Sequence, residues 1–259
     1  MKSYLPSLLI LVSGIMGQQI TEASRISKMP IIDGDVLNDD AWDNVPGVTS
    51  FTQKTPDEGK IVSENTVVKV AYSDDMFLVS VVCYDSEPNS LVISDTRRDS
   101  PLNNSDSFSF IIDTFKDYQT GYLFGTNPAG IEYDAQITGG GEGGGMMRRF
   151  SMGTGGGFNV NWDAVWKVEA KQGDFGWSAE FAIPFKTLRY KKDKDQSWGI
   201  NFERVIARKK EEAHWAPISR QFTMNRLVSA GTLTDMNVPT FRNIKILFRY
   251  CLLYTSDAA

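Results

Sequence analysis

The sequence predicts an all-β protein, a two-sheet antiparallel β-sandwich of the jelly-roll or immunoglobulin-like kind. Many short segments alternate apolar and polar residues, turn-forming residues separate them, and no long stretch shows the periodicity of an amphipathic helix. Short strands joined by tight turns are typical of sandwiches and of related all-β folds.

The predicted elements begin after a polar spacer. Asp33-Gly34 is a tight-turn sequence, and Asp39 to Trp42 has the sequence of one capped helical turn that buries Trp42 in the core. Asn127-Pro128-Ala129-Gly130 predicts a turn between two later strands. The predicted strands cover residues 66–72, 76–84, 107–113, 120–126, 131–137, 164–170, 177–183, 198–205 and 226–233.

One glycine-rich stretch, residues 138–158, departs from this pattern. Glycine at this density is incompatible with the interior of a strand, so we expect a loop there. A loop of this length is either functional or a disordered insertion, and both alternatives stay open at this point. The stretch lacks the Lys-Ser/Thr pair and the following helix of a phosphate-binding loop.

The first 17 residues have the pattern of a secretory signal peptide. Lys2 gives a positive start, Leu5 to Met16 is mostly apolar, and Gly17 offers a small residue before the cleavage point. An uncleaved anchor is the alternative. We therefore expect an exported protein of the periplasm, the outer membrane or the cell surface.

Composition narrows the possible function. The formal net charge is −5 and the pI is about 5.1, which argues against a nucleic-acid partner. The two cysteines, Cys83 and Cys251, do not make a disulfide framework. Cys83 lies in an apolar strand and is expected to be buried.

Several segments, taken in order, resemble the family 9-like carbohydrate-binding modules. Asn127-Pro128-Ala129-Gly130 together with Asp134 resembles the variant of these modules that is fused ahead of an outer-membrane β-barrel domain of unknown function. The segments that carry the resemblance are Ile32-Asp33-Gly34, Asp40-Ala41-Trp42, 68–75, Ser105-Asp106-Ser107-Phe108, Ile112-Asp113-Thr114, 177–185 and 198–204.

This resemblance implies a domain layout as well as a function. It implies a sugar-binding sandwich over residues 30–236 and the start of a truncated following domain over 237–250. Residues 251–259 look like a non-native tail translated from a sequencing adapter. The resemblance also implies a polysaccharide or oligosaccharide partner, a link to carbohydrate catabolism and glycoside hydrolase systems, and membrane association only through the missing β-barrel.

Sugar recognition needs flat aromatic faces and planar polar groups. Trp162 and Trp215 are the candidate stacking residues, because Trp177 and Trp198 share a strand face with core residues. The resemblance implies a pair of aromatic residues around a terminal sugar. The polar candidates are Arg97, Arg204, Arg208 and Glu211, with a structural Arg–Asp network as the alternative.

A structural calcium ion is implied by the resemblance. Asp106, Asp113 and Asp134 could supply its oxygen ligands, although their spacing matches no metal-binding loop.

Two other functions remain open. A glycoside hydrolase needs two carboxylates at a defined separation, and Glu180, Glu203, Asp106 and Asp134 are available, but no motif singles out a pair. The lone His214 has no apparent partner for a catalytic triad. The second alternative is a periplasmic accessory domain of the barrel without affinity for sugar. We therefore predict no catalytic residue in this chain.

Overall fold

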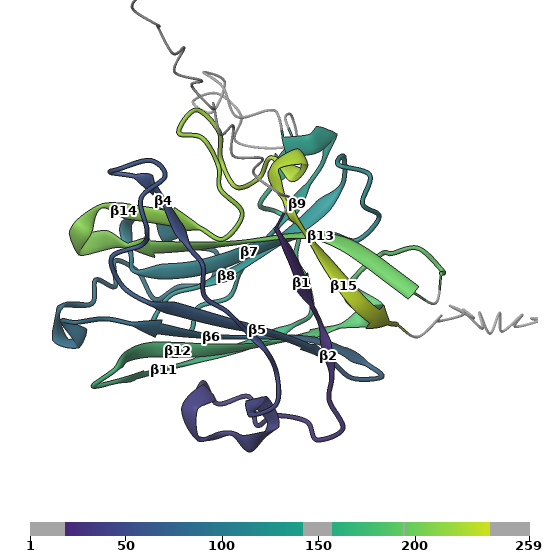
Figure 1. Ribbon diagram of the computed structural model, residues 1–259, viewed down its shortest axis with the longest axis horizontal. Coiled ribbons are helices and arrows are strands. Elements are labelled where there is room, and N and C mark those ends of the chain that lie inside the picture. The colour runs from purple at the N-terminus through teal and green to yellow at the C-terminus, as the bar shows by residue number, and fades with distance from the viewer. Residues whose placement is uncertain (1–18, 142–156, 194, 239–259) are drawn as a thin grey trace, which may run out of the picture.

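The computed structural model describes residues 19–141, 157–193 and 195–238, which form two β-sheets packed face to face (Figure 1). The predicted all-β sandwich is therefore confirmed. Within these residues the helices are short 3-10 turns, and no helix is long and apolar enough to cross a membrane. The predicted signal peptide, most of the glycine-rich stretch, nearly all of 237–250 and the whole of 251–259 lie outside the described residues.

The larger sheet has nine strands, and its backbone path runs β1-β15-β13-β7-β8-β9-β10, with β14 and then β4 added beside β13. In chain order its strands are β1 (Ile20–Glu22), β4 (Thr52–Thr55), β7 (Ser107–Asp113), β8 (Gly121–Thr126), β9 (Tyr133–Ile137), β10 (Phe158–Asn159), β13 (Asp195–Ile206), β14 (Glu211–His214) and β15 (Gly231–Asn237).

The smaller sheet has six strands in the order β11-β12-β6-β5-β2, with β3 beside β5. Its strands are β2 (Ser24–Arg25), β3 (Gly47–Val48), β5 (Thr66–Tyr72), β6 (Met76–Tyr84), β11 (Lys167–Gly173) and β12 (Gly176–Pro184). The 3-10 turns are η1 (Val36–Asn38), η2 (Asp40–Trp42), η3 (Pro88–Ser90), η4 (Leu102–Asn104), η5 (Gly139–Gly141), η7 (Phe185–Thr187), η8 (Ala207–Lys209) and η9 (Leu227–Ser229).

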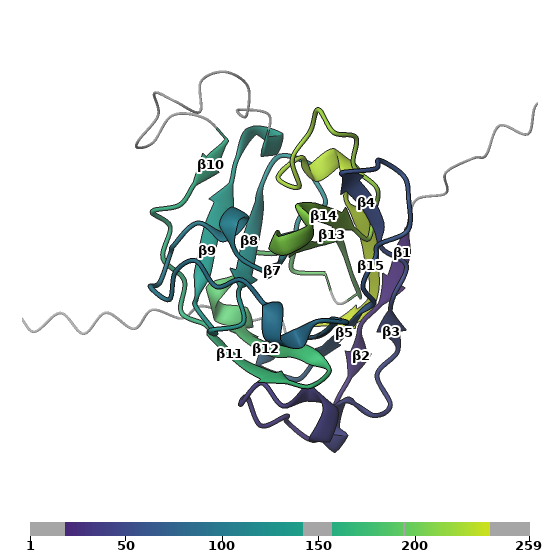
Figure 2. The same cartoon turned by 90° about the vertical axis from the view of Figure 1, so that its left-hand side faces the viewer.

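The main core lies between the two sheets and follows from the alternation of side chains along each strand. On β7 the side chains of Phe108, Phe110 and Ile112 point inward, and Phe110 packs edge-on against Phe181 of β12 with ring centroids 5.2 Å apart. Cys83 of β6 is buried in the same core, as predicted, and burial raises the pKa of its thiol to about 11. Figure 2 views this sandwich from one end.

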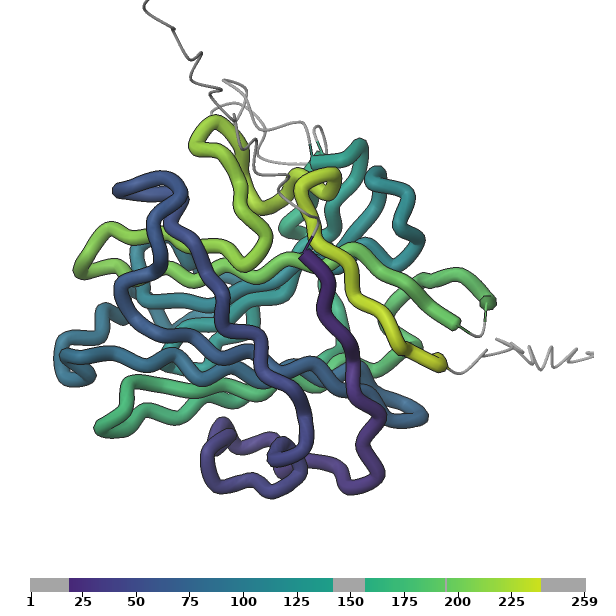
Figure 3. Tube along the Cα trace, viewed as in Figure 1, coloured from purple at the N-terminus to yellow at the C-terminus, as the bar shows by residue number. Residues whose placement is uncertain are grey.

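The first described residues join the two sheets. β1 pairs in parallel with β15 of the larger sheet, and β2 pairs in parallel with β5 of the smaller one. The chain between them stays hydrogen-bonded, since the Ala23 amide donates to the Thr234 carbonyl at 3.0 Å. Figure 3 shows this segment, in purple, passing from one sheet to the other. The sandwich is thus mostly antiparallel, with one parallel pair in each sheet.

The outer face of the smaller sheet is also apolar, and residues 26–46 cover it. Trp42 of η2 is buried there, and Asp39 caps this turn by accepting the Ala41 amide at 2.9 Å, as the sequence predicts. One buried carboxylate, Glu180 of β12, holds the segment. It accepts hydrogen bonds from Trp42 Nε1 at 2.7 Å, the Gly34 amide at 2.9 Å and the Asp33 amide at 3.1 Å.

Gly34 is required for this contact. Its φ is +84°, and a Cβ there would lie 2.5 Å from the carbonyl carbon of Ala170 in β11. Only glycine combines this conformation with such a close approach.

The predicted strands agree with the structure at 66–72, 76–84 and 107–113. The prediction of a strand over 226–233 is wrong in its first half. There the chain makes the 3-10 turn η9, because Leu227 packs onto the outer face of the larger sheet, and the strand β15 begins only at Gly231.

We predict that Glu180→Ala destabilises the protein by about 2–4 kcal/mol, because three N–H donors, two of them buried, lose their common acceptor. Urea unfolding followed by fluorescence measures this change. The control is Glu169→Ala on the exposed face of β11, which should change stability by less than about 0.5 kcal/mol. An equal effect of the two substitutions would contradict the role given to Glu180.

Candidate functional site

The outer face of the nine-stranded sheet is only partly covered. Residues 216–230 fold across one half of it, and Asn201 of β13 fixes where this segment starts. The Asn201 amide nitrogen donates to the Ala216 carbonyl at 2.9 Å, and its oxygen accepts the Ala216 amide at 2.8 Å. The second apolar cluster lies under this segment and consists of Ile111, Leu123, Ala135, Ile137, Ile218, Met224, Leu227 and Ala230.

The other half of this face is the floor of a groove with a volume of about 920 Å³. Small-molecule sites in proteins span roughly 300–1,000 Å³. Side chains from seven strands of the sheet, from the 101–104 segment that includes η4, and from residues 223–225 line it.

The walls of the groove combine aromatic rings and amides. Tyr133 of β9 and Phe158 of β10 are half-buried and face the groove from one edge of the sheet. Asn103, Asn104 and Asn225 are the three amide side chains among the lining residues.

The close approach of the Leu102 side chain to the backbone of Gly125 sets the depth of the groove. Leu102 of η4 packs down on the sheet above Gly125 of β8. A Cβ on Gly125 would lie 2.6 Å from Leu102 Cδ1 and 2.9 Å from Ser109 Cβ. Glycine at this position therefore lets the η4 wall rest directly on the sheet.

A row of polar side chains crosses the floor perpendicular to the strands. Lys54 Nζ lies 2.7 Å from Glu212 Oε1, and His214 Nε2 lies 3.1 Å from the same oxygen and 3.6 Å from Glu203 Oε2. Ser109 Oγ continues the row and donates to Glu203 Oε1 at 3.2 Å. The register explains the row, because Glu203 pairs with His214 on one side and with Ser109 on the other.

The two carboxylates of this row have opposite pKa shifts. Burial raises the pKa of Glu203, and the neighbouring Glu212 charge adds to this, while His214 opposes it. Burial also acts to raise the pKa of Glu212, but hydrogen bonds from His214 and Lys54 outweigh it and bring the pKa to about 2. Glu212 is therefore the ionised partner of Lys54, and Glu203 holds a proton more readily.

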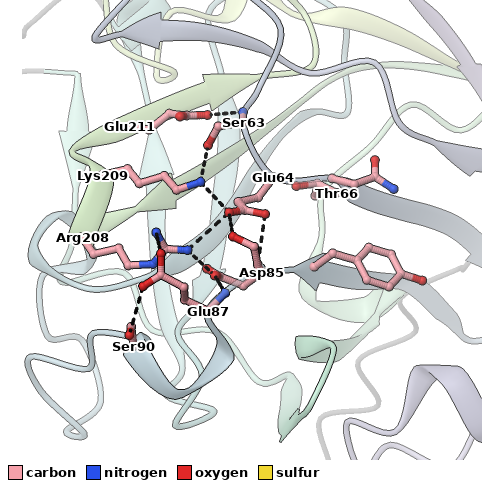
Figure 4. Close-up of polar contacts among 12 residues, drawn as sticks. Ser63, Glu64, Thr66, Asp85, Glu87, Ser90, Arg208, Lys209 and Glu211 are labelled. Atoms are coloured by element: carbon pink, nitrogen blue, oxygen red, sulfur yellow. Dashed lines mark hydrogen bonds and ion pairs between the residues drawn. The ribbon is translucent and has the colours of Figure 1, made fainter.

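A cluster of charged side chains positions one rim of the groove (Figure 4). Arg208 of η8 pairs with Asp85, lies 3.3 Å from Glu64 Oε1 and contacts Glu87 at 3.4 Å. Lys209 pairs with Glu64 as well. These ion pairs connect the end of β13 to the chain flanking β5 and β6, so they tie the rim to the opposite sheet.

Two of the predicted ligand residues are buried in the core. Trp215 is 3% exposed and packs on Phe202 with ring centroids 5.5 Å apart, so its prediction as a stacking residue is wrong. It shares a strand face with Ala213, which points between the sheets. Arg204 is fully buried between the sheets and donates to the backbone carbonyls of Asn65 and Tyr84.

The other predicted residues divide between surface and groove. Trp162 is half-buried, and its ring lies 4.9 Å from that of Tyr122, away from the groove lining. Arg97 is exposed and pairs with Asp95, while Arg208 belongs to the rim cluster. The contacts of Arg208 thus favour the structural alternative. Only Glu211 lines the groove, where its Oε1 accepts the Ser63 amide at 2.8 Å.

The three aspartates expected to bind calcium do not come together. Asp106 and Asp113 lie at opposite ends of β7, which puts their Cα atoms about 20 Å apart. Each carboxylate already accepts a backbone amide: Asp106 that of Val92, Asp113 that of Tyr118 and Asp134 that of Ala164. These three residues therefore cannot share one ion, and calcium binding itself stays a prediction.

The aromatic and amide residues of the groove were not predicted from the sequence, because nothing in the local sequence around them distinguishes them from other surface residues. The sequence does contain one pattern that indicates the polar residues of the groove floor. Glu212 and His214 alternate with Ala213 and Trp215, which places both polar side chains on one face of a strand.

Comparison with known proteins identifies the fold. The sequence matches no protein-family profile and no curated protein. The structure is similar to a family 9 carbohydrate-binding module from Caldicellulosiruptor kristjanssonii in complex with glucose, with a TM-score of 0.57, 16% identity, and coverage of 87% of this chain and 98% of that one. The same kind of module from this organism in complex with cellotriose gives 0.54 and 15%, covering 88% and 98%.

A third similar structure is a protein from Bacteroides uniformis described as a candidate carbohydrate-binding protein. Its TM-score is 0.62 at 12% identity, with coverage of 84% of this chain and 99% of that one. The chain therefore has the fold of the family 9 modules, as the sequence resemblance predicted.

The ion pairs of the rim cluster should make the free energy of unfolding decrease at acid pH. Burial acts to raise the pKa of Glu64, but hydrogen bonds from Lys209 and Ser86 outweigh it, so the pKa is about 2 instead of 4.5. A lowered folded pKa stabilises the protein above the unfolded value, and this contribution is lost as pH falls towards 2. Wild type should have a higher free energy of unfolding than Glu64→Gln at about pH 5, and this difference should decrease by about 1–3 kcal/mol as the pH is lowered to about 2.

Urea unfolding at a series of pH values measures this difference. Glu58→Gln, at an exposed position, is the control and should show no such narrowing. A constant difference between wild type and Glu64→Gln across this range would contradict the ionised Glu64–Lys209 pairing.

Proposed function

We propose that the protein binds a carbohydrate chain in the groove on the outer face of the nine-stranded sheet. One observation carries the proposal: in a fold shared with carbohydrate-binding modules, the uncovered half of a sheet face is lined by aromatic rings, amides and charged groups.

The lining suits the chemistry of a sugar ring. A pyranose has apolar C–H faces and a periphery of hydroxyl groups, so it needs a flat ring beside planar donors and acceptors. Tyr133 and Phe158 supply the rings. Asn103, Asn104 and Asn225 each offer both a donor and an acceptor for hydroxyl groups.

The charge of the groove favours a neutral ligand. Glu203, Glu211 and Glu212 face it together with only two cationic side chains, Lys54 and Lys210. Lys54 is already paired with Glu212. A polyanionic glycan such as a uronic acid polymer would be repelled, whereas a neutral oligosaccharide would not. Glucose and cellotriose, which the similar modules hold, are the first ligands to test.

We further propose that binding takes place outside the cytoplasm, in the service of carbohydrate catabolism. The support for export is the signal-peptide pattern of residues 1–17. Membrane association would come only from a following domain.

The aromatic residues of the groove provide the test. Calorimetric titration of the folded protein with glucose and cello-oligosaccharides, followed by a glycan array, should identify a ligand. Tyr133→Ala and Phe158→Ala should each weaken its affinity by about tenfold or more, because the stacking surface is lost. Tyr118→Ala, at an exposed tyrosine that does not line the groove, should leave the affinity unchanged.

Two results would count against the proposal. Absence of binding to every glycan by protein shown to be folded would refute carbohydrate binding and favour the accessory-domain alternative. Binding that Tyr133→Ala and Phe158→Ala leave intact would place the site elsewhere. Release of reducing sugar from the bound glycan would instead support the glycoside hydrolase.

A further inference from the structure

The polar row on the groove floor contains an arrangement that sugar recognition does not require. Among the residues that the structure describes, Glu203, Glu212 and His214 are the one group of three potential metal ligands whose donor atoms all lie within 4.8 Å of one another. We propose that these three side chains form a site for one divalent transition-metal ion of the zinc type.

The distances fit such an ion. Zinc binds imidazole nitrogen and carboxylate oxygen at about 2.0–2.2 Å, which places two ligand atoms of a tetrahedral site about 3.3–3.6 Å apart. His214 Nε2 lies 3.1 Å from Glu212 Oε1 and 3.6 Å from Glu203 Oε2. An ion would therefore need only small side-chain rotations to take up its bonds.

The ligand set argues for a zinc-type metal over calcium. Calcium takes six to eight oxygen ligands, whereas one imidazole and two carboxylates are a donor set of zinc and its neighbours in the first transition series. His214 is the only histidine of the chain.

The scaffold holds the three side chains in place. Glu203 and His214 are paired residues on neighbouring strands β13 and β14, and Glu212 lies two residues before His214 on the same face. The imidazole of His214 is fully buried, and its Nδ1 has no hydrogen-bond partner, so all its polar contacts are on the Nε2 side. Ser109 donates to Oε1 of Glu203, and Oε2 of the same carboxylate faces His214 Nε2.

The site would be open on one side. Glu203 and Glu212 line the groove, whereas His214 lies behind them. Three protein ligands leave a fourth position for water or a ligand atom. Metal binding does not depend on the proposed sugar binding and is measured without sugar.

The positive charge of Lys54 should weaken metal binding by electrostatic repulsion, and this effect can be measured. Its ammonium group lies 2.7 Å from Glu212 Oε1, the oxygen that would bind the metal. Replacement of this cation by an uncharged side chain of similar length should strengthen metal binding by about threefold or more. A purely adventitious surface site would not respond to Lys54.

The experiment is a zinc titration of untagged, chelator-treated protein by calorimetry, with Cys251→Ser in every variant to remove the cysteine of the tail. We expect one zinc ion per chain that excess calcium does not displace. Glu203→Gln and His214→Gln should each weaken binding by about tenfold or more, Lys54→Met should strengthen it, and the exposed control Glu22→Gln should not change it.

X-ray absorption of the zinc-loaded wild type provides a readout that does not depend on the folding of any variant. Scattering from one imidazole must come from His214, since the chain has no other histidine. No saturable zinc binding, a spectrum without imidazole, or an affinity unchanged in both Glu203→Gln and Lys54→Met would overturn the proposal.

Discussion

The paired hydrogen bonds between the Asn201 side chain and the backbone of Ala216 decide which part of the nine-stranded sheet stays open. The outer face of the smaller sheet and one half of the outer face of the larger sheet are apolar, so each of these surfaces needs a cover. On the smaller sheet Glu180 fixes residues 26–46 across it. On the larger sheet Asn201 starts the cover at the middle strand, and it extends over only one half. In both places one buried polar side chain fixes an irregular segment whose own backbone groups would otherwise lack partners.

The groove lies on the half of the outer face that residues 216–230 leave uncovered. Along β13 and β7 the outward residues change character where the cover ends: Asn201 and Ile111 lie beneath it, while Glu203 and Ser109 lie beyond it on the groove floor. The alternation of strands places these residues on one face, and the cover then separates them into core and site. The charged cluster around Arg208 fixes the opposite rim, so the groove is held from both of its ends.

This division explains what the sequence could and could not predict. The alternation in β5, β6 and β7 is a local property, and it predicted the bounds of these three strands correctly. The site depends on which outward residues stay uncovered, and on strand pairing that no local pattern encodes. The prediction that Trp215 is an exposed stacking residue was wrong because the pairing of β14 was not recognised. This residue follows the charged stretch 209–212, which suggested an exposed connection, but that stretch contains a strand that turns Trp215 inward. Glu203 and His214 are neighbours only through the register of β13 and β14.

The crossing segment at the start of the chain has a consequence for assembly. Ile20 pairs with Thr232 in the last strand, so the first described strand of the sandwich finds its place only when the last one exists. Contacts between residues this far apart in sequence slow folding, because the loop must close before they form. A ribosome-bound chain therefore keeps Ile20–Glu22 unpaired until Gly231–Asn237 has been synthesised. During that interval the segment that later joins the two sheets has no strand partner in the larger sheet.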